Sequence, residues 1–293
     1  MALHVEHYNS LVATAGAVGG NKAGVARVKS FPPPSVMTAV AKAVGFSETA
    51  FVVLTSEPNV VAVRFFTPEG EVDLCGHATI AVFSAMPRNA SYVMQTTTQG
   101  SLRVVVDANG RVCMEQSKPT FRPLTAPADV DAILAALNLP RAHLGDVPIT
   151  IVSTGLPDIF VHVASSHVLH DVMRPDMAAI AALSTQHNTI GMHVFTLSPD
   201  EDDVTAECRN FAPRFGIDEE AATGTSSGAL GALLLHHGRA TSPLTFSQGR
   251  RMGLPSRIGC IITTEAASIT GVEISGIADP CGGQDVDVDA SSL

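Results

Sequence analysis

The chain has 293 residues, of which 45% are apolar and 16% charged, with a mean hydropathy of +0.25. This composition favours a compact soluble protein, and the length favours two domains or one large one. The net charge of -10 argues against nucleic-acid binding, because no basic stripe offsets it. No apolar run reaches the roughly 18–20 residues that span a bilayer, so we expect no membrane association.

The N-terminus and the cysteines favour a cytoplasmic protein. The first ten residues contain no basic segment followed by an apolar one, so a secretory signal is not expected. Five cysteines, at positions 75, 113, 208, 260 and 281, form no C-x-x-C pair. Their odd number and wide spacing indicate neither a zinc site nor a disulfide framework, and reduced thiols are the default.

Helical and strand patterns are mixed along the chain. Helices are expected over residues 35–44, 79–86, 130–137, 177–183 and 226–237, the first between a run of prolines and Gly45. Strands rich in Val, Ile and Phe are expected over 60–66, 101–106, 111–115, 149–152, 159–163, 192–196, 204–208 and 260–264. The dipeptide Asn109-Gly110 predicts a hairpin turn. Together these elements predict an α+β fold with mostly antiparallel pairing.

An internal repeat divides the chain. The pattern R-x-F-x-P at residues 64–68 recurs at residues 209–213, and each copy precedes a glycine at a predicted helix start. A Gln-Gly dipeptide follows each glycine at nearly the same distance, at 99–100 and at 248–249. Three landmarks in one order indicate duplication. We therefore expect two similar halves, residues 1–118 and 119–280, and a mobile charged tail over 281–293.

Each half has a loop that ends in glycine where a helix begins: Cys75-Gly76-His77 in one half and Thr223-Gly224-Thr225 in the other. A helix N-terminus offers unpaired N–H groups and positive potential, and glycine lets a ligand approach the backbone. If the duplication brings both loops to one cleft, they would clamp a small carboxylate. Each loop alone is equally consistent with an ordinary helix cap.

Three acid–base candidates accompany these loops. His77 lies in a first helical turn, where the dipole disfavours positive charge, so a neutral imidazole is expected. Glu219 and Glu220 precede the second helix, and one of them could serve only the helix dipole. Glu48 lies among apolar residues, and desolvation is expected to raise its pKa, as a general acid or base requires.

Four motifs, in order, resemble one family: S-E-T-A-F-V at 47–52, R-x-F-x-P at 64–68, C-G-H-A-T at 75–79 and E-E-A-A-T-G-T at 219–225. With Gly20-Asn21 near the N-terminus, they are similar to the PhzF-like proteins of phenazine biosynthesis, from about residue 5 to 276. The resemblance implies the diaminopimelate-epimerase fold, in which two pseudo-symmetric halves each wrap a curved sheet around a central helix. It also implies an active site between the halves and a cofactor-independent isomerase, often a homodimer. The family's named enzyme converts trans-2,3-dihydro-3-hydroxyanthranilate to a keto tautomer by moving a proton.

The resemblance also assigns roles by position. It implies that Glu48 is the acid/base that moves the proton, while His77 and Glu220 hold the substrate and tune Glu48. The implied substrate-binding residues are Asn21, Cys75, Gly76, Thr223, Gly224 and Thr225. Glu220 stands where the family has Asp, and Thr225 where it has Ser. Both replacements keep the carboxylate or hydroxyl group but alter the size of the side chain that carries it. The implied partner is a small cyclic or aromatic-like carboxylate, with no metal and no cofactor.

Two other functions stay open. A dehydratase or epimerase-related enzyme could use Cys75 as a single base, and a catalytically silent protein on this fold could bind a small molecule. Two-base racemisation is not expected, because Thr223 replaces the second thiol and a hydroxyl is too weak a base. The G-x-S-x-G pattern at 224–228 lacks the strand and the downstream histidine of a hydrolase. The histidine pairs at 4/7, 167/170 and 236/237 lack a third metal ligand.

Overall fold

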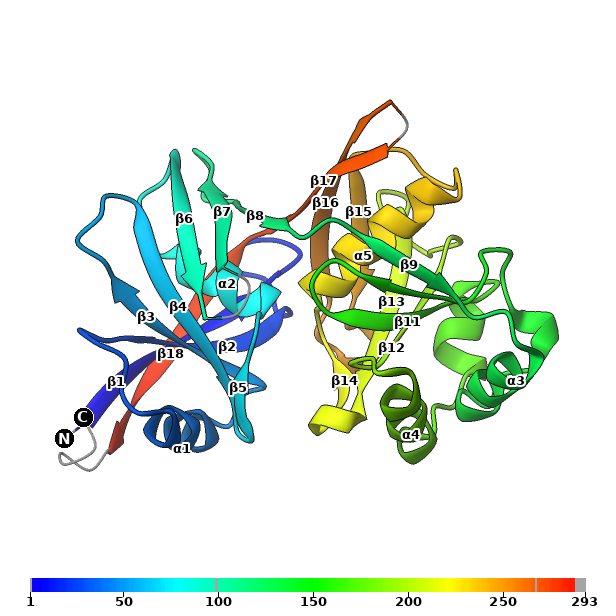
Figure 1. The fold of residues 1–293 in the computed structure, drawn as a ribbon, viewed down its shortest axis with the longest axis horizontal. Helices are drawn as coiled ribbons and strands as arrows, with labels where there is room; N and C mark the ends of the chain where they lie inside the picture. Colours follow the sequence, from blue (N-terminus) through cyan, green and yellow to red (C-terminus); the bar gives the residue numbers. More distant parts are fainter. Residues whose placement is uncertain (1, 98–99, 267, 288–293) are drawn as a thin grey trace. The chain divides into compact units, whose positions relative to one another are not determined.

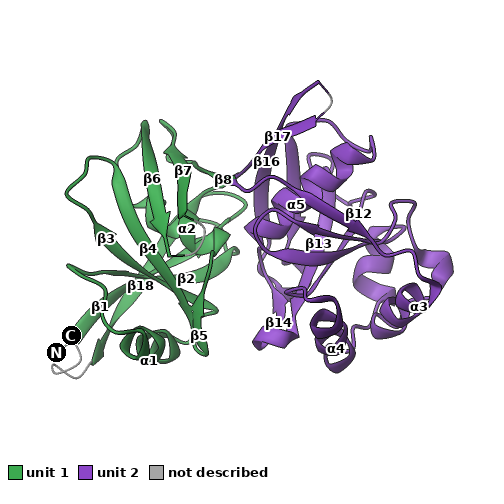
Figure 2. Cartoon of the chain, viewed as in Figure 1, with its two compact units in different colours: residues 1–115, 275–293 green, residues 116–274 purple. Residues whose placement is uncertain are grey.

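The computed structural model describes residues 2–97, 100–266 and 268–287. The chain forms two compact units, of which the first combines Met1–Glu115 with Ser275–Leu293 and the second is Gln116–Ile274 (Figure 2). The last segment of the chain thus belongs with the first unit, whereas the repeat had placed residues up to 280 in the C-terminal half.

The described residues of the first unit form two helices and a set of mostly antiparallel strands (Figure 1). Its elements are β1 (Ala2–Ser10), β2 (Asn21–Arg27), α1 (Pro34–Val44), β3 (Glu48–Leu54), β4 (Val60–Thr67), β5 (Gly70–Val72), α2 (Gly76–Ser84), β6 (Ala90–Thr96), β7 (Gly100–Val106), β8 (Val112–Gln116) and, at the end of the chain, β18 (Ala278–Asp287).

The second unit contains the remaining elements. They are β9 (Thr120–Pro123), α3 (Pro127–Ala136), η1 (Arg141–His143), β10 (Thr150–Ser153), β11 (Pro157–His162), η2 (Val168–Val172), α4 (Met177–His187), β12 (Met192–Thr196), β13 (Ala206–Ala212), η3 (Pro213–Phe215), β14 (Ile217–Glu220), α5 (Gly224–His236), β15 (Leu244–Gln248), η4 (Arg250–Met252), β16 (Ser256–Glu265) and β17 (Ser268–Gly276).

Strand pairing repeats between the two units. In the first, β2–β3 and β4–β6 are parallel, while β3–β4 and β6–β7 are antiparallel. In the second, β11–β12 and β13–β15 are parallel, while β12–β13 and β15–β16 are antiparallel. The helices α1 and α4 precede equivalent strands, as do α2 and α5. The order of pairings therefore carries the duplication that the sequence repeat indicated.

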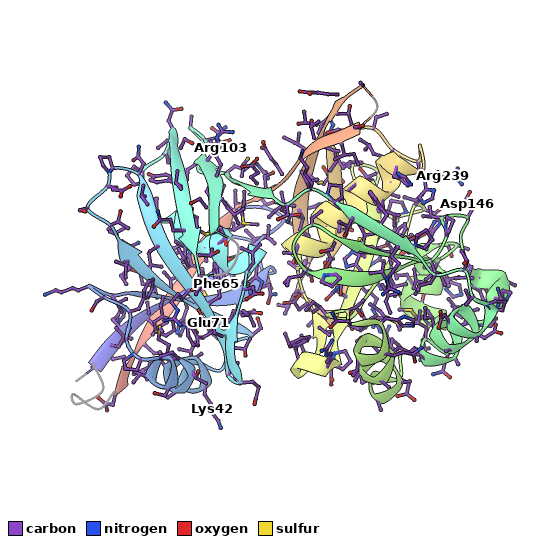
Figure 3. All side chains as sticks on the ribbon, in the orientation of Figure 1. Lys42, Phe65, Glu71, Arg103, Asp146 and Arg239 are labelled. Atoms are coloured by element: carbon purple, nitrogen blue, oxygen red, sulfur yellow. The ribbon has the colours of Figure 1, made fainter. Side chains whose placement is uncertain are left out.

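The helices fall into two kinds according to which faces are buried. In α1 one face is buried, at Val36, Met37, Val40, Ala41 and Val44, and Lys42 on the other face points away from the unit (Figure 3). This spacing is that of an amphipathic helix lying on a sheet. By contrast, α2 is buried from Gly76 to Phe83 and α5 from Gly224 to Leu234. Each is thus the central helix around which the strands of its unit pack.

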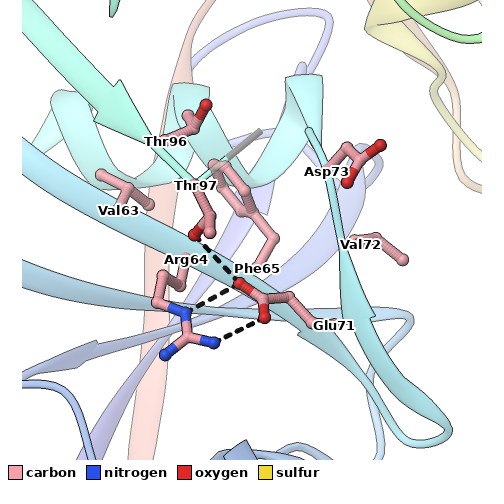
Figure 4. Close-up of a pocket in the computed structure, with 8 residues that line it drawn as sticks. All are labelled: Val63, Arg64, Phe65, Glu71, Val72, Asp73, Thr96 and Thr97. Atoms are coloured by element: carbon pink, nitrogen blue, oxygen red, sulfur yellow. Dashed lines mark hydrogen bonds and ion pairs between the residues drawn. The ribbon is translucent and has the colours of Figure 1, made fainter. Parts of the chain in front are cut away.

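The repeated R-x-F-x-P pattern has a structural cause. Arg64 makes two hydrogen bonds to Glu71, of 2.7 and 2.5 Å, and Thr97 donates a third to that carboxylate at 3.2 Å (Figure 4). In the second unit Arg209 forms the same pair of bonds to Glu219, each 2.8 Å long. Each arginine ties its long strand to a short hairpin strand, β5 or β14, just before the central helix begins.

The two clamps differ in burial, which gives a prediction for stability. The side chains of Arg209 and Glu219 are 6% and 17% exposed, against 19% and 30% for Arg64 and Glu71. Breaking a buried pair leaves an uncompensated charge, so we expect Glu219→Gln to lower the free energy of unfolding by roughly 2–4 kcal/mol. Glu71→Gln should cost about 1 kcal/mol, since its pair is more exposed. Urea unfolding measures the loss of unfolding free energy in both variants. Equal losses would refute the prediction that Glu219→Gln costs more than Glu71→Gln.

Several predicted elements need correction. The helix expected from residue 79 begins three residues earlier, at Gly76, since its first turn is part of the glycine loop. The tail expected from residue 281 is strand as far as Asp287, because β18 pairs antiparallel with β1. The segment contains Pro and Gly, which are rare in strands, so its sequence does not predict one. Its partner, β1, lies at the other end of the chain. Residues 288–293 of the expected tail lie outside the described residues.

The hairpin at Asn109-Gly110 is confirmed. It joins the antiparallel strands β7 and β8, with Gly110 at φ +86° and the Asp107 carboxylate accepting two backbone N–H groups of the turn. None of the helices in the described ranges has both the length and the apolar content that a membrane span needs.

Candidate functional site

Four side chains meet where α2 begins in the first unit. Glu48 opens β3 and His77 lies in the first turn of α2, and their Oε2 and Nε2 atoms are 3.2 Å apart. The Sγ of Cys75 lies 3.4 Å from Nδ1 of the same ring, and the amide of Asn21 lies 3.3 Å from Nδ1. Glu48, Cys75 and His77 are all buried, at 8%, 6% and 2% exposure. The structure thus brings together four of the predicted site residues.

This cluster holds a buried ion pair. Burial alone would raise the pKa of Glu48, but the charge of His77 and hydrogen bonds from His77, Ser47 and Cys75 bring it below its usual range. Burial lowers the pKa of His77, but its interactions with Cys75 and Glu48, including hydrogen bonds to both side chains, outweigh burial and raise the pKa well above its usual value. At neutral pH the pair is therefore a carboxylate and an imidazolium.

The charge states expected from the sequence are reversed by this pairing. Desolvation was expected to raise the pKa of Glu48, and the helix dipole was expected to keep His77 neutral. Each expectation considered one group in isolation, whereas each group supplies the other's counter-charge across 3.2 Å. Cys75 stays uncharged. Burial, and in second place the charge of Glu48, raise the pKa of its thiol to about 11. It is therefore a thiol at neutral pH.

Sequence reasoning missed Ser47 as a part of this cluster. Its Oγ lies 3.4 Å from Nε2 of His77, beside the Glu48 contact. The only signal was its place in the S-E-T-A-F-V motif, directly before Glu48. Oε2 of Glu48 is buried and lies 3.2 Å from Nε2 of His77, its ion-pair partner. A buried carboxylate oxygen in that position keeps a lone pair that can take a proton.

A second cluster lies where α5 begins in the other unit. The Thr223 hydroxyl donates to Oε2 of Glu220 at 2.6 Å. Gln248 holds both residues, because its Nε2 donates to the Glu220 carbonyl at 2.8 Å and to the Thr223 hydroxyl at 3.0 Å. Its Oε1 accepts the Thr223 backbone N–H at 3.2 Å. The structure thus fixes the geometry of two predicted site residues through one that was not predicted.

Gln248 did have a sequence signal, the repeated Gln-Gly dipeptide. Gly249 has φ +81°, and a Cβ there would lie 2.2 Å from the Leu254 carbonyl oxygen and 2.6 Å from that of Ala221. Only glycine fits both the backbone angle and the space. The first Gln of the repeat, Gln99, lies outside the described residues.

The helix starts themselves are not closed by ordinary side-chain caps. Neither Cys75 nor Thr223, the residues preceding the first turns of α2 and α5, accepts a hydrogen bond from its helix through its side chain. At the start of α5, Gln116 donates to the Gly224 carbonyl at 3.1 Å and Thr154 donates to the Thr225 carbonyl at 3.2 Å. The simple capping explanation of these two loops therefore has no support in the geometry.

Beneath α5 lies a polar network that the sequence did not indicate. Asp158 of β11 accepts hydrogen bonds from the Ser226 hydroxyl, the Gly191 N–H and the Asn210 amide. Asp158 is 4% exposed, and burial raises its pKa to about 6 although these three bonds lower it. Asn210 also contacts the ring of His193 at 3.2 Å. The network anchors the first turn of α5 to the sheet.

Asp158 gives a pH prediction. Its folded pKa, about 6, exceeds its ordinary value of 3.8. The folded state therefore binds this proton more tightly, so its stabilising contribution is present at low pH and is lost as pH rises from about 4 to 6. The loss amounts to about 3 kcal/mol.

Asp158→Asn removes this titration while keeping an acceptor for Gly191. The difference in unfolding free energy between the wild type and this variant should fall by about 2 kcal/mol between pH 4 and pH 7. His162 and His193, whose pKa values burial lowers to about 4 and about 3, are present in both proteins and cancel in the difference. A difference that stays constant with pH would contradict the assignment.

The internal repeat is broken at the Glu48 position. Thr49 pairs with Phe66 in the first unit, and Met192 pairs with Phe211 in the second. Since the two phenylalanines are equivalent in the repeated pattern, the residues one place earlier, Glu48 and Gly191, are also equivalent. A Cβ on Gly191 would lie 1.8 Å from the Phe211 carbonyl oxygen. One unit therefore carries a carboxylate at this position and the other has no room for a side chain.

One histidine of each pair considered above as a metal ligand, at 4/7, 167/170 and 236/237, contacts another side chain. His4 bonds to Asp285 at 2.7 Å and His167 to Asp171 at 3.1 Å. His236 stacks on Phe121 with its centroid 4.6 Å away. Glu219, the neighbour of Glu220, belongs to the clamp of Arg209 described above.

Comparison with known proteins places this fold and sequence in context. The family model described as phenazine biosynthesis-like protein, PhzC-PhzF, matches residues 12–281. An uncharacterized isomerase, YddE, of Salmonella typhimurium is 33% identical over 272 residues, covering 88% of this chain and 90% of that protein. A trans-2,3-dihydro-3-hydroxyanthranilate isomerase of Pseudomonas fluorescens is 28% identical over 252 residues, or 83% and 85% of the two proteins.

Solved structures agree on the fold. A Bacillus anthracis phenazine biosynthesis protein of the PhzF family matches with a TM-score of 0.86 at 25% identity, covering 98% of this chain and 100% of that one. A hydroxyproline epimerase of Agrobacterium vitis matches with a TM-score of 0.62 at 13% identity, over 99% and 94%. The predicted α+β, diaminopimelate-epimerase-like fold class is confirmed.

Proposed function

Because the chain belongs to the PhzC-PhzF family of phenazine biosynthesis-like proteins, we propose that it is an isomerase that moves a proton on a small cyclic or aromatic-like carboxylate, with Glu48 as the acid/base. The observation that carries the proposal is the buried contact of 3.2 Å between Oε2 of Glu48 and Nε2 of His77. The names of the relatives, several of them isomerases, support the reaction class.

Glu48 starts the reaction as a base. Its carboxylate removes a proton from a substrate carbon that lies next to a conjugated π-system. The electron pair of the broken C–H bond moves into that system. The carboxylic acid so formed then returns the hydrogen to another carbon of the same substrate. The protein's own groups suffice for both steps, since one carboxyl group is successively base and acid.

His77 favours the return of the proton from Glu48 to the substrate. As an imidazolium it stabilises the Glu48 carboxylate before the transfer and loses its counter-ion when Glu48 becomes an acid. A low pKa makes Glu48 a weak base, so proton removal requires a substrate whose hydrogen is already acidified by conjugation. A carbon acid of that kind, with a carboxylate for binding, is the substrate class that this pair favours.

The thiol of Cys75 is a poorer candidate for the base. With its pKa raised to about 11, the thiolate is scarce at neutral pH. Its contact with His77 at 3.4 Å instead supports a role in holding the ring. Asn21 would share that role, at 3.3 Å. The raised pKa of the Cys75 thiol favours the isomerase over the single-thiol dehydratase.

Substrate binding is proposed for the glycine loops. The N–H groups that open α2 at Gly76 and α5 at Gly224 carry the positive end of a helix dipole, which suits a carboxylate. Glu220 and Thr223, held by Gln248, would accept or donate hydrogen bonds to polar groups of the substrate. The longer side chain of Glu220 and the added methyl group of Thr225, relative to the family's Asp and Ser, support a substrate that differs from that of the named enzyme.

Proton exchange in deuterated water tests the proposal. The protein is incubated with trans-2,3-dihydro-3-hydroxyanthranilate and with a panel of small cyclic and aromatic carboxylates, and deuterium entering a carbon position is followed by NMR. At least one compound should gain deuterium and isomerise. Binding across the panel without any exchange would instead identify a silent binding protein.

A further inference from the structure

The cluster at the start of α2 has a second chemical capacity. Glu48, Cys75 and His77 each offer one ligand atom, and these atoms all lie within 4.8 Å of one another. A carboxylate oxygen, a thiolate sulfur and an imidazole nitrogen are the ligands that Zn²⁺ and related cations prefer. From the sequence these three residues are expected in the substrate site, and no metal is expected there.

The spacing of the atoms suits a tetrahedral ion. Ligands placed about 2.0–2.3 Å from such an ion are separated from one another by roughly 3.3–3.7 Å. Nε2 of His77 lies 3.2 Å from Oε2 of Glu48 and 3.8 Å from Sγ of Cys75. An ion could therefore be bound with small side-chain movements. The side-chain amide of Asn21 contacts Nδ1 of the same ring at 3.3 Å.

The charge of the buried cluster balances in both states. With a carboxylate, an imidazolium and a thiol, the cluster is neutral. A divalent cation bound to a carboxylate, a neutral imidazole and a thiolate is neutral as well. Binding forms three metal–ligand bonds, breaks the S–H bond of Cys75 and one N–H bond of His77, and releases two protons to solvent. No net charge is buried in this exchange, which matters because an unbalanced charge there would be costly.

We propose that Glu48, Cys75 and His77 form a binding site for Zn²⁺ and chemically similar divalent cations, which block the Glu48 base when bound. The binding stands on the ligand geometry alone, while the inhibition rests on the proposed function. Hard cations such as Mg²⁺ should not compete, because they avoid thiolate ligands.

Cobalt provides a direct spectroscopic test. Co²⁺ is titrated into the reduced full-length chain, and its visible d–d bands and near-ultraviolet thiolate charge-transfer band are recorded. Proton release is followed with a pH indicator in weak buffer. We expect one ion per chain, intense bands of tetrahedral type and two protons released per ion. Cys75→Ser should weaken binding at least about 100-fold and abolish the charge-transfer band.

Matched variants identify the ligands. Cys281 is exposed, so Cys281→Ser should keep the whole signal. His77→Gln, checked for native folding by circular dichroism, should lose the tetrahedral bands and serves in place of Cys75→Ser if that variant fails to fold. A charge-transfer band that survives both Cys75→Ser and His77→Gln, or no thiolate band in the wild type, would overturn the proposal.

Inhibition is measured separately. Zn²⁺ should stop deuterium exchange at one ion per chain, and a chelator should restore it. Spectroscopic binding without inhibition would overturn the blocking of Glu48 and leave the site standing. If no substrate shows exchange, the proposed function fails while the cobalt result still decides the binding site.

Discussion

Glu48→Gln should lower the rate of deuterium exchange into substrate about 10²–10⁴-fold, the range that general acid–base catalysis contributes. The amide keeps the size and a hydrogen-bonding oxygen beside His77, but it cannot accept a proton from carbon. Substrate affinity should change little, because the proposed binding groups lie at the loops of Gly76 and Gly224. Exchange is measured by NMR in deuterated water, and affinity by calorimetry.

Glu57→Gln is the matched control for this variant. Glu57 is an exposed glutamate of the same unit, with no part in the cluster, so its replacement should leave exchange unchanged. Undiminished exchange in Glu48→Gln would remove Glu48 from the mechanism. Loss of both exchange and binding would give it a binding role instead.

Gly191→Ala should destabilise the protein by roughly 4 kcal/mol or more, an unusually large effect for one methyl group. The new Cβ would lie 1.8 Å from the Phe211 carbonyl oxygen. The backbone cannot easily move away, because the Gly191 N–H donates to Asp158 at 2.7 Å and its carbonyl accepts from Ile159 at 3.0 Å. Urea unfolding measures the loss.

Gly271→Ala is the control for the Gly191 prediction. Its Cβ would meet only Thr263, at the ordinary contact distance of 3.5 Å, so stability should change by less than about 1 kcal/mol. A similar small change at Gly191 would show that the close approach of β12 and β13 is not maintained in solution. It would also weaken the conclusion that this position can hold no counterpart of Glu48.

The sequence was most informative where a motif fixes a local structure. The loops at Gly76 and Gly224 and the motif around Glu48 identified residues that the structure brings together within each unit. The helix α1 and the hairpin at Asn109-Gly110 followed from local turn and periodicity signals. In each case the information lies within a few residues along the chain.

Long-range partners account for what the sequence did not yield. The strand β18 forms against β1 from the opposite end of the chain, and Gln248 reaches Glu220 across 28 positions. Asp158 is hydrogen-bonded to Gly191, Asn210 and Ser226, which follow it by 33, 52 and 68 positions. The charge states of Glu48 and His77 were reversed for the same reason, since each depends on a partner from another element.

Three expectations from the sequence stay predictions: a homodimer, a cytoplasmic location and a substrate clamp formed jointly by the two glycine loops. Sedimentation equilibrium would test the first. A double-mutant cycle between Glu48→Gln and Glu220→Gln, read as substrate affinity, would test the last, because independent sites give additive effects.

Proton exchange by Glu48→Gln and Cys75→Ala, measured side by side on the same substrate in deuterated water, tests the assignment of the base most directly. The proposed function predicts that Cys75→Ala keeps most of the exchange while Glu48→Gln loses it. Loss in Cys75→Ala with retention in Glu48→Gln would contradict it and make the thiol the base.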